Sequence, residues 1–230
     1  MFDLDNTLTY PCEEISHEMF KTLKKLSKKY TLGIVSSSNY ERIHNQIKDL
    51  SIFKFIFCEN GTVSYDKGEI IHHVKFPEYV GEEKFKNLIN FLLMYMSKLD
   101  IPVKRGNFID CRNGLLSISP LGRCCSLSER MKFIEYEEVA KTREAFIENI
   151  KNNFKEFDID CTIGGKISFE VFPKGWDKTY CLQFLKNFKV IFYGDKVCDY
   201  GNDLSIYNSV QSKYKVDSPE DTLKIIREYL

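Results

Sequence analysis

The sequence predicts an α/β protein in which a doubly wound parallel sheet is interrupted by an inserted α+β domain. Helical and strand patterns alternate at both ends of the chain, whereas the middle holds two hairpin patterns beside two long helical stretches. Strands that alternate with helices form parallel sheets, and hairpins form antiparallel ones. We therefore expect a core domain at residues 1–76 and 179–230 and an inserted cap domain at residues 77–178.

The expected core domain begins with alternating helices and strands. Apolar residues recur at helical spacing from Ile15 to Leu26, which predicts an amphipathic helix. Residues 31–38, TLGIVSSS, have the pattern of a short buried strand that ends in hydroxyl groups. Residues 40–47 are then predicted to form a helix, and residues 52–61 a second strand.

The same alternation returns near the C-terminus. Residues 187–195, NFKVIFYGD, have an apolar strand pattern that breaks into a Gly-Asp loop. A final helix is predicted after Ser218, because serine is a favourable N-cap and the pattern PEDTLKIIREYL follows it.

The middle of the chain has a different pattern. Residues 108–120 and 157–172 read as hairpins that turn at Asn113-Gly114 and at Gly164-Gly165. The helical stretches accompany them at residues 81–98 and 138–155. Together they predict the antiparallel α+β cap.

Composition narrows the classes of function. Of the 230 residues, 43% are hydrophobic and 29% charged, which is typical of a globular protein. Lys plus Arg equals Asp plus Glu at 33 each, so we expect neither nucleic acid nor an anionic membrane surface as a partner. The sequence has no apolar run of the roughly 20 residues that a membrane helix needs. Eight cysteines without a CxxC pair favour a reduced, cytoplasmic location.

Acidic residues stand where the predicted parallel strands end. Asp3 and Asp5 follow the first apolar residues, Asp195 follows a later strand, and Asp203 comes within one loop of it. The carboxyl ends of parallel strands meet at one edge of the sheet, where ligands bind. Converging carboxylates suit magnesium, and an aspartate beside this metal can accept a phosphoryl group. Alternatively, Asp, Asn and Gly simply form turns after strands.

Several stretches of the chain resemble a known family. FDLDNTLT at residues 2–9 and GDKVCDYGND at 194–203 are similar to motifs of the haloacid-dehalogenase phosphotransferase superfamily. KRGNFIDCRNGLLSISPLGRCCSLSER at 104–130 and GGKISFEVFPKGWDKTYCL at 164–182 resemble the eukaryotic phosphomannomutases. The resemblance covers nearly the whole chain and implies a Rossmann-like core of the haloacid-dehalogenase type with an inserted cap.

The resemblance also implies roles for core residues. Asp3 is expected to be the nucleophile and Asp5 the general acid/base. Magnesium is expected to be held by Asp3, by Asp5 through its carbonyl and by Asp195, with Asp203 nearby. Lys178 lies in the first turn of a helix predicted to begin near residue 176, where a cation opposes the helix dipole unless an anion is bound.

A phosphate beside Asp3 would supply that anion. The resemblance implies that Lys178 and a hydroxyl of the SSS segment cradle it. Ser37 is the preferred hydroxyl, and Ser36 and Ser38 remain alternatives.

Residues of the cap are expected to hold the sugar phosphate. The family uses arginines that match Arg112, Arg123 and Arg130 to bind the far phosphate, and the fork of a guanidinium suits phosphate bidentately. Ser168 and Glu170 match positions that contact the sugar hydroxyls. Taken singly, each arginine would more often be a solvated surface residue.

Several positions depart from the family pattern, among them Asn6 and Cys12. Asn6 replaces a glycine in the nucleophile loop, and asparagine tolerates left-handed backbone better than most residues. Cys12 replaces an arginine that contacts substrate in the family. We expect this loss to weaken binding of the sugar phosphate or to alter specificity.

The expected function is that of a magnesium-dependent phosphomannomutase. It would interconvert mannose 6-phosphate and mannose 1-phosphate through a phosphoaspartate, with a hexose 1,6-bisphosphate as activator, and supply GDP-mannose synthesis. Two alternatives stay open: a sugar-phosphate or nucleotide phosphatase that uses the same aspartates, and a degenerate homologue that only binds phosphosugars. The resemblance also implies a homodimer formed through the cap.

Overall fold

The computed structural model describes residues 1–230 and divides them into two compact units. The core unit comprises residues 1–73 and 176–230, and the cap unit comprises residues 74–175. The boundaries expected from the sequence place Lys178 in the cap. In the structure the core unit resumes at Trp176 and therefore includes Lys178. The Trp176 carbonyl is fixed there because it accepts a hydrogen bond from Asn60 Nδ2 at 3.1 Å.

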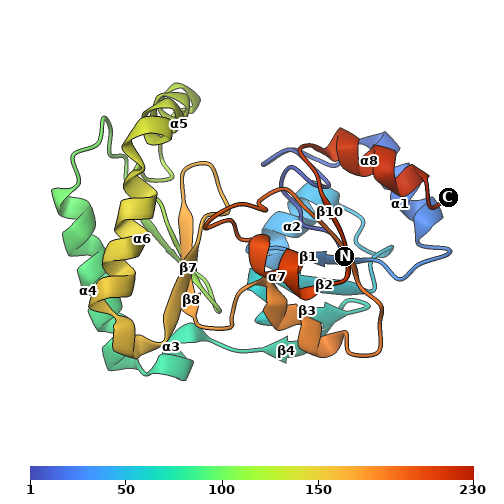
Figure 1. The fold of residues 1–230 in the computed structure, drawn as a ribbon, viewed down its shortest axis with the longest axis horizontal. Coiled ribbons are helices and arrows are strands. Elements are labelled where there is room, and N and C mark those ends of the chain that lie inside the picture. Colours follow the sequence, from blue (N-terminus) through green and yellow to red (C-terminus); the bar gives the residue numbers. More distant parts are fainter. The chain divides into compact units, whose positions relative to one another are not determined.

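The core unit contains the predicted parallel sheet (Figure 1). Its strands are β1 (Gly33–Val35), β2 (Phe55–Cys58), β9 (Ile191–Gly194) and β10 (Ser212–Lys215), which are parallel, and β3 (Val63–Asp66) and β4 (Glu69–His73), which add an antiparallel edge. Phe2 takes the place of a central strand, because it bridges Ile34 on one side and Tyr193 on the other. Its N–H donates to Gly33 at 3.0 Å. Asp3 therefore stands at the carboxyl edge of the sheet.

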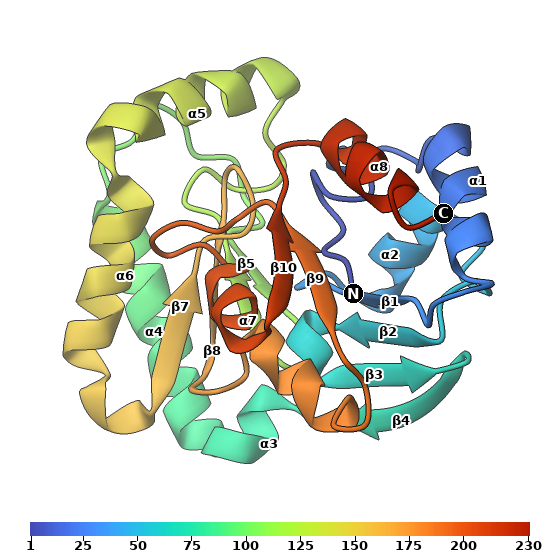
Figure 2. The same ribbon diagram turned by 45° about the vertical axis from the view of Figure 1, so that its right-hand side comes forward.

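Helices cover both faces of this sheet, as a doubly wound core requires. The helices of the first face are α1 (His17–Leu26), α2 (Tyr40–Ile47) and α8 (Pro219–Arg227). The opposite face is covered by the 3-10 helix η3 (Lys178–Phe184) and by α7 (Leu204–Ser209). Figure 2 shows α1 and α8 side by side. The helix expected to start near residue 176 is thus a 3-10 helix that starts at Lys178, capped by the Asp177 side chain.

The cap unit contains the predicted antiparallel sheet. Its order is β5 (Ile109–Cys111), β6 (Leu116–Ile118), β8 (Phe169–Pro173) and β7 (Ile159–Thr162). Its helices are α3 (Phe76–Val80), α4 (Glu82–Lys98), α5 (Leu127–Ala140) and α6 (Thr142–Asn153). The helix predicted at 138–155 is divided, because Lys141 adopts a left-handed conformation between α5 and α6. The start of α5 carries a capping box formed by Ser126 and Glu129.

Alternation along the cap strands separates an apolar face from a polar one. On the apolar face, the ring of Phe169 lies 5.1 Å from that of Phe146 in α6, which in turn stacks on Tyr95 of α4. On the polar face, neighbouring strands place Asp110 opposite Ser117, and Ser117 opposite Glu170. The cap helices therefore cover the apolar face, and the polar face carries the residues expected to meet substrate. No helix in the structure is both long and apolar enough to cross a bilayer.

Candidate active site

Three carboxylates come together at the carboxyl edge of the core sheet. Asp3 follows the bridging Phe2, Asp195 follows β9, and Asp203 directly precedes α7. One oxygen from each lies within 4.8 Å of the others. Segments that are far apart in the sequence are therefore joined at the edge where the sequence predicted a cluster.

Lys178 lies inside this cluster with its side chain 0% exposed. Its Nζ donates to Asp3 Oδ1 at 2.6 Å and to Asp203 Oδ1 at 2.7 Å. A lysine is almost never fully buried unless it is paired. The buried ammonium is thus satisfied by two carboxylates from different elements.

The cluster has more negative than positive charge in its interior. Burial and the nearby Asp203 carboxylate raise the pKa of Asp3 well above its ordinary value, and the same two causes raise the pKa of Asp195. Burial alone would lower the pKa of Lys178, but the Asp203 and Asp3 carboxylates raise it, so the ammonium stays charged. One buried cation thus faces three carboxylates. Hard oxygen donors with surplus negative charge fit a divalent cation such as Mg²⁺.

Backbone groups and small residues hold the cluster in place. Asp203 Oδ2 accepts a hydrogen bond from the Lys196 N–H at 3.0 Å. A Cβ at Gly194 would lie only 2.6 Å from the Asp203 carboxyl carbon, so only glycine lets β9 approach so closely. Asn6 has a left-handed φ of 58° and donates from Nδ2 to Asp195 Oδ2 at 3.0 Å. Asn202, beside Asp203, has a buried Oδ1 without a hydrogen-bond partner.

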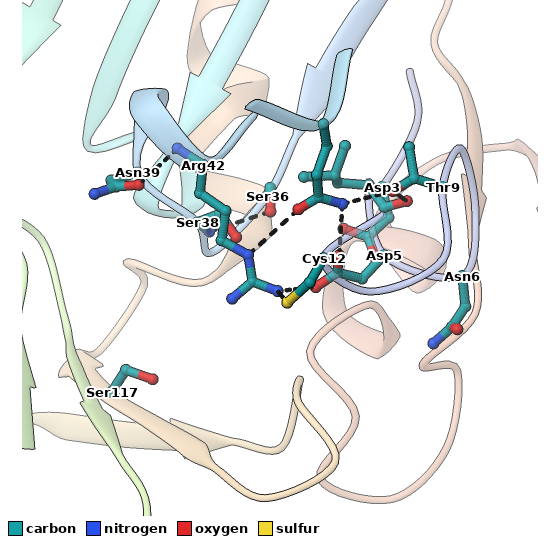
Figure 3. Close-up of polar contacts among 12 residues, drawn as sticks. Asp3, Asp5, Asn6, Thr9, Cys12, Ser36, Ser38, Asn39, Arg42 and Ser117 are labelled. Atoms are coloured by element: carbon teal, nitrogen blue, oxygen red, sulfur yellow. Dashed lines mark hydrogen bonds and ion pairs between the residues drawn. The ribbon is translucent and has the colours of Figure 1, made fainter. Parts of the chain in front are cut away.

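The carboxylate of Asp5 is not part of this cluster, and Figure 3 shows it beside Arg42 of α2. Its Oδ2 accepts a hydrogen bond from Arg42 Nη2 at 2.8 Å, and its Oδ1 accepts one from Gln46 Nε2 at 3.0 Å. Two aspartates one residue apart are thus placed in different surroundings. Asp3 is buried among charges, and Asp5 is held at a partly exposed position by two donors.

The serines expected to bind phosphate follow β1, at the same edge of the sheet. Ser36 and Ser38 are buried, and Ser36 Oγ accepts a hydrogen bond from the Ser38 N–H at 3.1 Å. Ser37 between them is half-buried. The choice of Ser37 as the phosphate ligand stays a prediction.

Two of the three cap arginines lie near one acidic residue. Arg112 donates to Asp110 Oδ2 from Nε at 3.0 Å and from Nη2 at 2.8 Å. Arg123 Nη2 donates to Ser117 Oγ at 2.6 Å and lies 4.0 Å from the same Asp110 oxygen. The cap sheet therefore presents two guanidinium groups along one polar row. Arg130 belongs to a different element, α5.

Ser168 directly precedes β8, and Glu170 is the second residue of this strand. Glu170 Oε2 accepts a hydrogen bond from Thr162 Oγ1 across the strand pair at 3.2 Å. A Cβ at Gly165 would lie 2.7 Å from Ser168 Oγ, so a larger residue there would require this hydroxyl to move. Arg143 Nη1 donates to the carbonyls of Gly165 and Ser168, which fixes this turn from α6.

Three residues with contacts at the site are not predicted by any sequence pattern: Arg42, Gln46 and Arg143. Arg42 and Gln46 stand four residues apart on the helix that follows the serine segment, a spacing that places two side chains on one face. That spacing was the available signal, but it identifies no partner, because Asp5 belongs to another element. Arg143 pairs with Glu137 across the α5–α6 junction, which the predicted single helix did not contain.

Solved structures share the fold at low sequence identity. A haloacid dehalogenase-like hydrolase from Bacteroides thetaiotaomicron matches with a TM-score of 0.60 and 15% identity, over 100% of this chain and 98% of that one. The C-terminal domain of a trehalose-6-phosphate phosphatase from C. albicans matches with a TM-score of 0.68 and 15% identity, over 98% and 89%. The predicted core with an inserted cap is therefore confirmed as a haloacid-dehalogenase-like fold.

Sequence relatives are much more similar. A phosphomannomutase from Galdieria sulphuraria is 44% identical over 228 residues, 97% of this chain and 91% of the relative. Phosphomannomutase 2 from Dictyostelium discoideum is 42% identical over 236 residues, covering 100% and 95%. The family model described as eukaryotic phosphomannomutase matches residues 19–230. The chain belongs to the eukaryotic phosphomannomutase family.

Proposed function

We propose that this protein is a phosphomannomutase that interconverts mannose 6-phosphate and mannose 1-phosphate and so supplies GDP-mannose synthesis. The observation that carries the proposal is the buried Asp3–Lys178–Asp203 arrangement, with Asp5 held apart from it, in a chain of this family. Phosphoryl transfer to an aspartate uses a nucleophilic carboxylate with a fixed positive charge beside it, and this arrangement provides both.

The two aspartates have surroundings that suit different tasks. Lys178 binds Asp3 Oδ1, so Oδ2 is the oxygen proposed to attack phosphorus. A bond then forms between Asp3 and phosphorus of the hexose 1,6-bisphosphate activator, and the bond from phosphorus to the sugar oxygen breaks. Asp5 gives a proton to the departing oxygen. In the second step Asp5 takes the proton of a hydroxyl of the hexose monophosphate while that oxygen receives the phosphoryl group from Asp3, which gives a hexose 1,6-bisphosphate. The other phosphoryl group of this bisphosphate then passes to Asp3, and the isomerised monophosphate is released.

Magnesium is the proposed cofactor. Asp3, Asp195 and the carbonyl of Asp5 would hold it, with Asp203 nearby, and the surplus negative charge of the cluster supports this assignment. When bound, the ion would offset the charge of the carboxylates and of the phosphoryl oxygens. Lys178 contributes a second, permanent positive charge to the same place.

The remaining assignments concern recognition of the hexose phosphates. Ser37 and Lys178 are proposed to bind the transferring phosphate, and Arg112, Arg123 and Arg130 the sugar's other phosphate. The polar row of the cap sheet supports a role in sugar binding for Glu170, and we propose the same role for Ser168. We also propose that the protein is cytoplasmic and forms a homodimer through the cap.

Purified protein assayed with mannose 1-phosphate, Mg²⁺ and a hexose 1,6-bisphosphate tests the proposal. We expect mannose 6-phosphate to form faster than inorganic phosphate is released. Faster release of phosphate with every activator would assign a phosphatase instead. An Asp3→Asn variant that keeps its folded spectrum serves as the control for contaminating activity.

A further inference from the structure

Two side chains of α2 bind the Asp5 carboxylate, and one of them, Arg42, is labelled in Figure 3. Arg42 binds Oδ2 at 2.8 Å, and Gln46 binds Oδ1 at 3.0 Å, so each donor engages a different oxygen. Arg42 and Gln46 are one helical turn apart and also contact each other, because Arg42 Nε donates to Gln46 Oε1 at 3.3 Å. Asp5, Arg42 and Gln46 thus form a closed set of contacts. The Asp5 carboxylate cannot rotate without losing a hydrogen bond.

This set is itself anchored to the loop that carries Asp5. Gln46 is buried, and its Nε2 also donates to Thr9 Oγ1 at 2.6 Å. Thr9 closes the loop, since its carbonyl accepts the Asn6 N–H at 2.7 Å. Arg42 Nη2 lies 3.9 Å from Cys12 Sγ, on the same loop. Helix α2 and the loop of residues 4–12 therefore hold Asp5 jointly.

These contacts contribute little to the stability of the fold. The side chains of Arg42 and Asp5 are 33% and 30% exposed, and ion pairs of such exposure contribute little to the free energy of unfolding. What the contacts do provide is orientation. A carboxylate oxygen accepts two hydrogen bonds, so each oxygen of Asp5 still has room for a substrate hydroxyl.

We propose that Arg42 and Gln46 are positioning residues that fix the Asp5 carboxylate for proton transfer to and from the sugar oxygen. This inference rests on the proposed function, because it presumes that Asp5 is the acid/base. Neither residue touches the reacting atoms. Both act through Asp5, and the charged donor Arg42 is expected to matter more than the neutral donor Gln46.

A comparison of leaving groups tests the proposal. The sugar oxygen of a hexose bisphosphate leaves only if it receives a proton, whereas nitrophenolate leaves from p-nitrophenyl phosphate without one. The measurement is the pre-steady-state burst of product from each compound, which reports the first transfer to Asp3 alone. A change that damages the fold or Asp3 slows both bursts, and a change in the position of Asp5 slows only the burst from the sugar.

We expect Arg42→Gln to slow the sugar burst by about ten- to a hundredfold, as for loss of one hydrogen bond to a charged group. Gln46→Met, which keeps the side-chain volume, should slow it by about two- to tenfold. Arg42→Lys keeps the charge and should recover part of the rate. The nitrophenolate burst should stay at the wild-type rate in all three variants.

Asp5→Asn separates failure of this inference from failure of the proposed function. If Asp5→Asn slows both bursts equally, Asp5 is not the acid/base and the proposed mechanism is wrong. If Asp5→Asn is selective for the sugar but Arg42→Gln is not, only the positioning role is overturned. Combining Arg42→Gln with Asp5→Asn should cause no loss beyond that of Asp5→Asn.

Lys48→Gln is the matched control. Lys48 directly follows α2 and pairs with a carboxylate, Glu14, at 3.1 Å, but this pair is exposed. Its loss should leave both bursts unchanged. A selective loss in Lys48→Gln equal to that of Arg42→Gln would show that any cation beside α2 has the same effect, and it would overturn the assignment.

Discussion

Lys178 of the core unit and Arg123 of the cap unit show two different ways of placing a positive charge. In the core unit, Lys178 is completely buried and its charge is balanced inside the protein by Asp3 and Asp203. In the cap unit, Arg123 is 27% exposed and shares one partly exposed aspartate with Arg112. A buried charge is costly unless its partners are exact in number and place, whereas a half-exposed charge tolerates exchange of its partner. Lys178 is therefore neutralised only by its protein partners, whereas water also solvates Arg123.

Asp3→Asn should produce the largest effect, complete loss of phosphoryl transfer and of any phosphatase activity. An amide is a poor phosphoryl acceptor and gives no charge to Lys178 or to a metal. Turnover of mannose 1-phosphate checks this, with circular dichroism as the test of folding. Near-normal turnover would show that Asp3 is not the nucleophile.

Lys178→Met tests the difference in burial directly. Removal of the buried ammonium leaves Asp3 and Asp203 uncompensated and should lower the free energy of unfolding by about 3–5 kcal/mol. The matched change in the cap, Arg123→Met, should cost about 0–1 kcal/mol, because its ion pair is partly solvated. Urea unfolding in EDTA measures both variants. Equal losses would remove the distinction between the two units.

Magnesium should stabilise the core unit. A ligand that binds only the folded state at a hundredfold excess over its Kd adds about 2.7 kcal/mol to the free energy of unfolding. Thermal unfolding of the wild type should therefore shift upward with Mg²⁺ and return with EDTA. Asp195→Asn should reduce this shift, and Lys224→Gln, which changes an exposed lysine of α8, should keep it. An unchanged shift in Asp195→Asn would exclude Asp195 as a ligand.

Arg130→Ala tests whether the cap unit binds the second phosphate of the substrate. One lost charge-assisted contact to phosphate is worth about 1.5–3 kcal/mol, so transfer to sugar should fall about ten- to a hundredfold. The rate of transfer to water should fall much less, because water has no second phosphate for Arg130 to bind. Both rates are measured together with mannose 1-phosphate and its bisphosphate. A proportional fall of both would favour a phosphatase.

Local signals in the sequence were sufficient for most elements. Residues 40–47 form the predicted helix, and the final helix is capped by Ser218 as expected. Both cap hairpins form at the predicted turns. These features are decided within a few residues by apolar periodicity, capping and turn chemistry, so a single chain segment contains the information.

The candidate site was predicted only in part, for the same physical reason. Asp3, Asp195 and Asp203 could be expected to converge, because parallel strands end at one edge. Which of these carboxylates contact Lys178 could not be predicted. That Lys178 is buried between Asp3 and Asp203 depends on where the chain re-enters the core unit.

Asp3 and Asp5 show most clearly which features follow from the sequence and which follow from tertiary packing. The sequence alone determined that Asp3 and Asp5 lie at the end of a buried segment, one residue apart. Tertiary packing is what places Asp3 against Lys178. It also places Asp5 against Arg42 and Gln46. Alternation along an extended segment sends such side chains the same way, and the tight loop after Asp3 separates them. Their partners come from helices distant in the sequence, so packing of the whole core unit had to assign them.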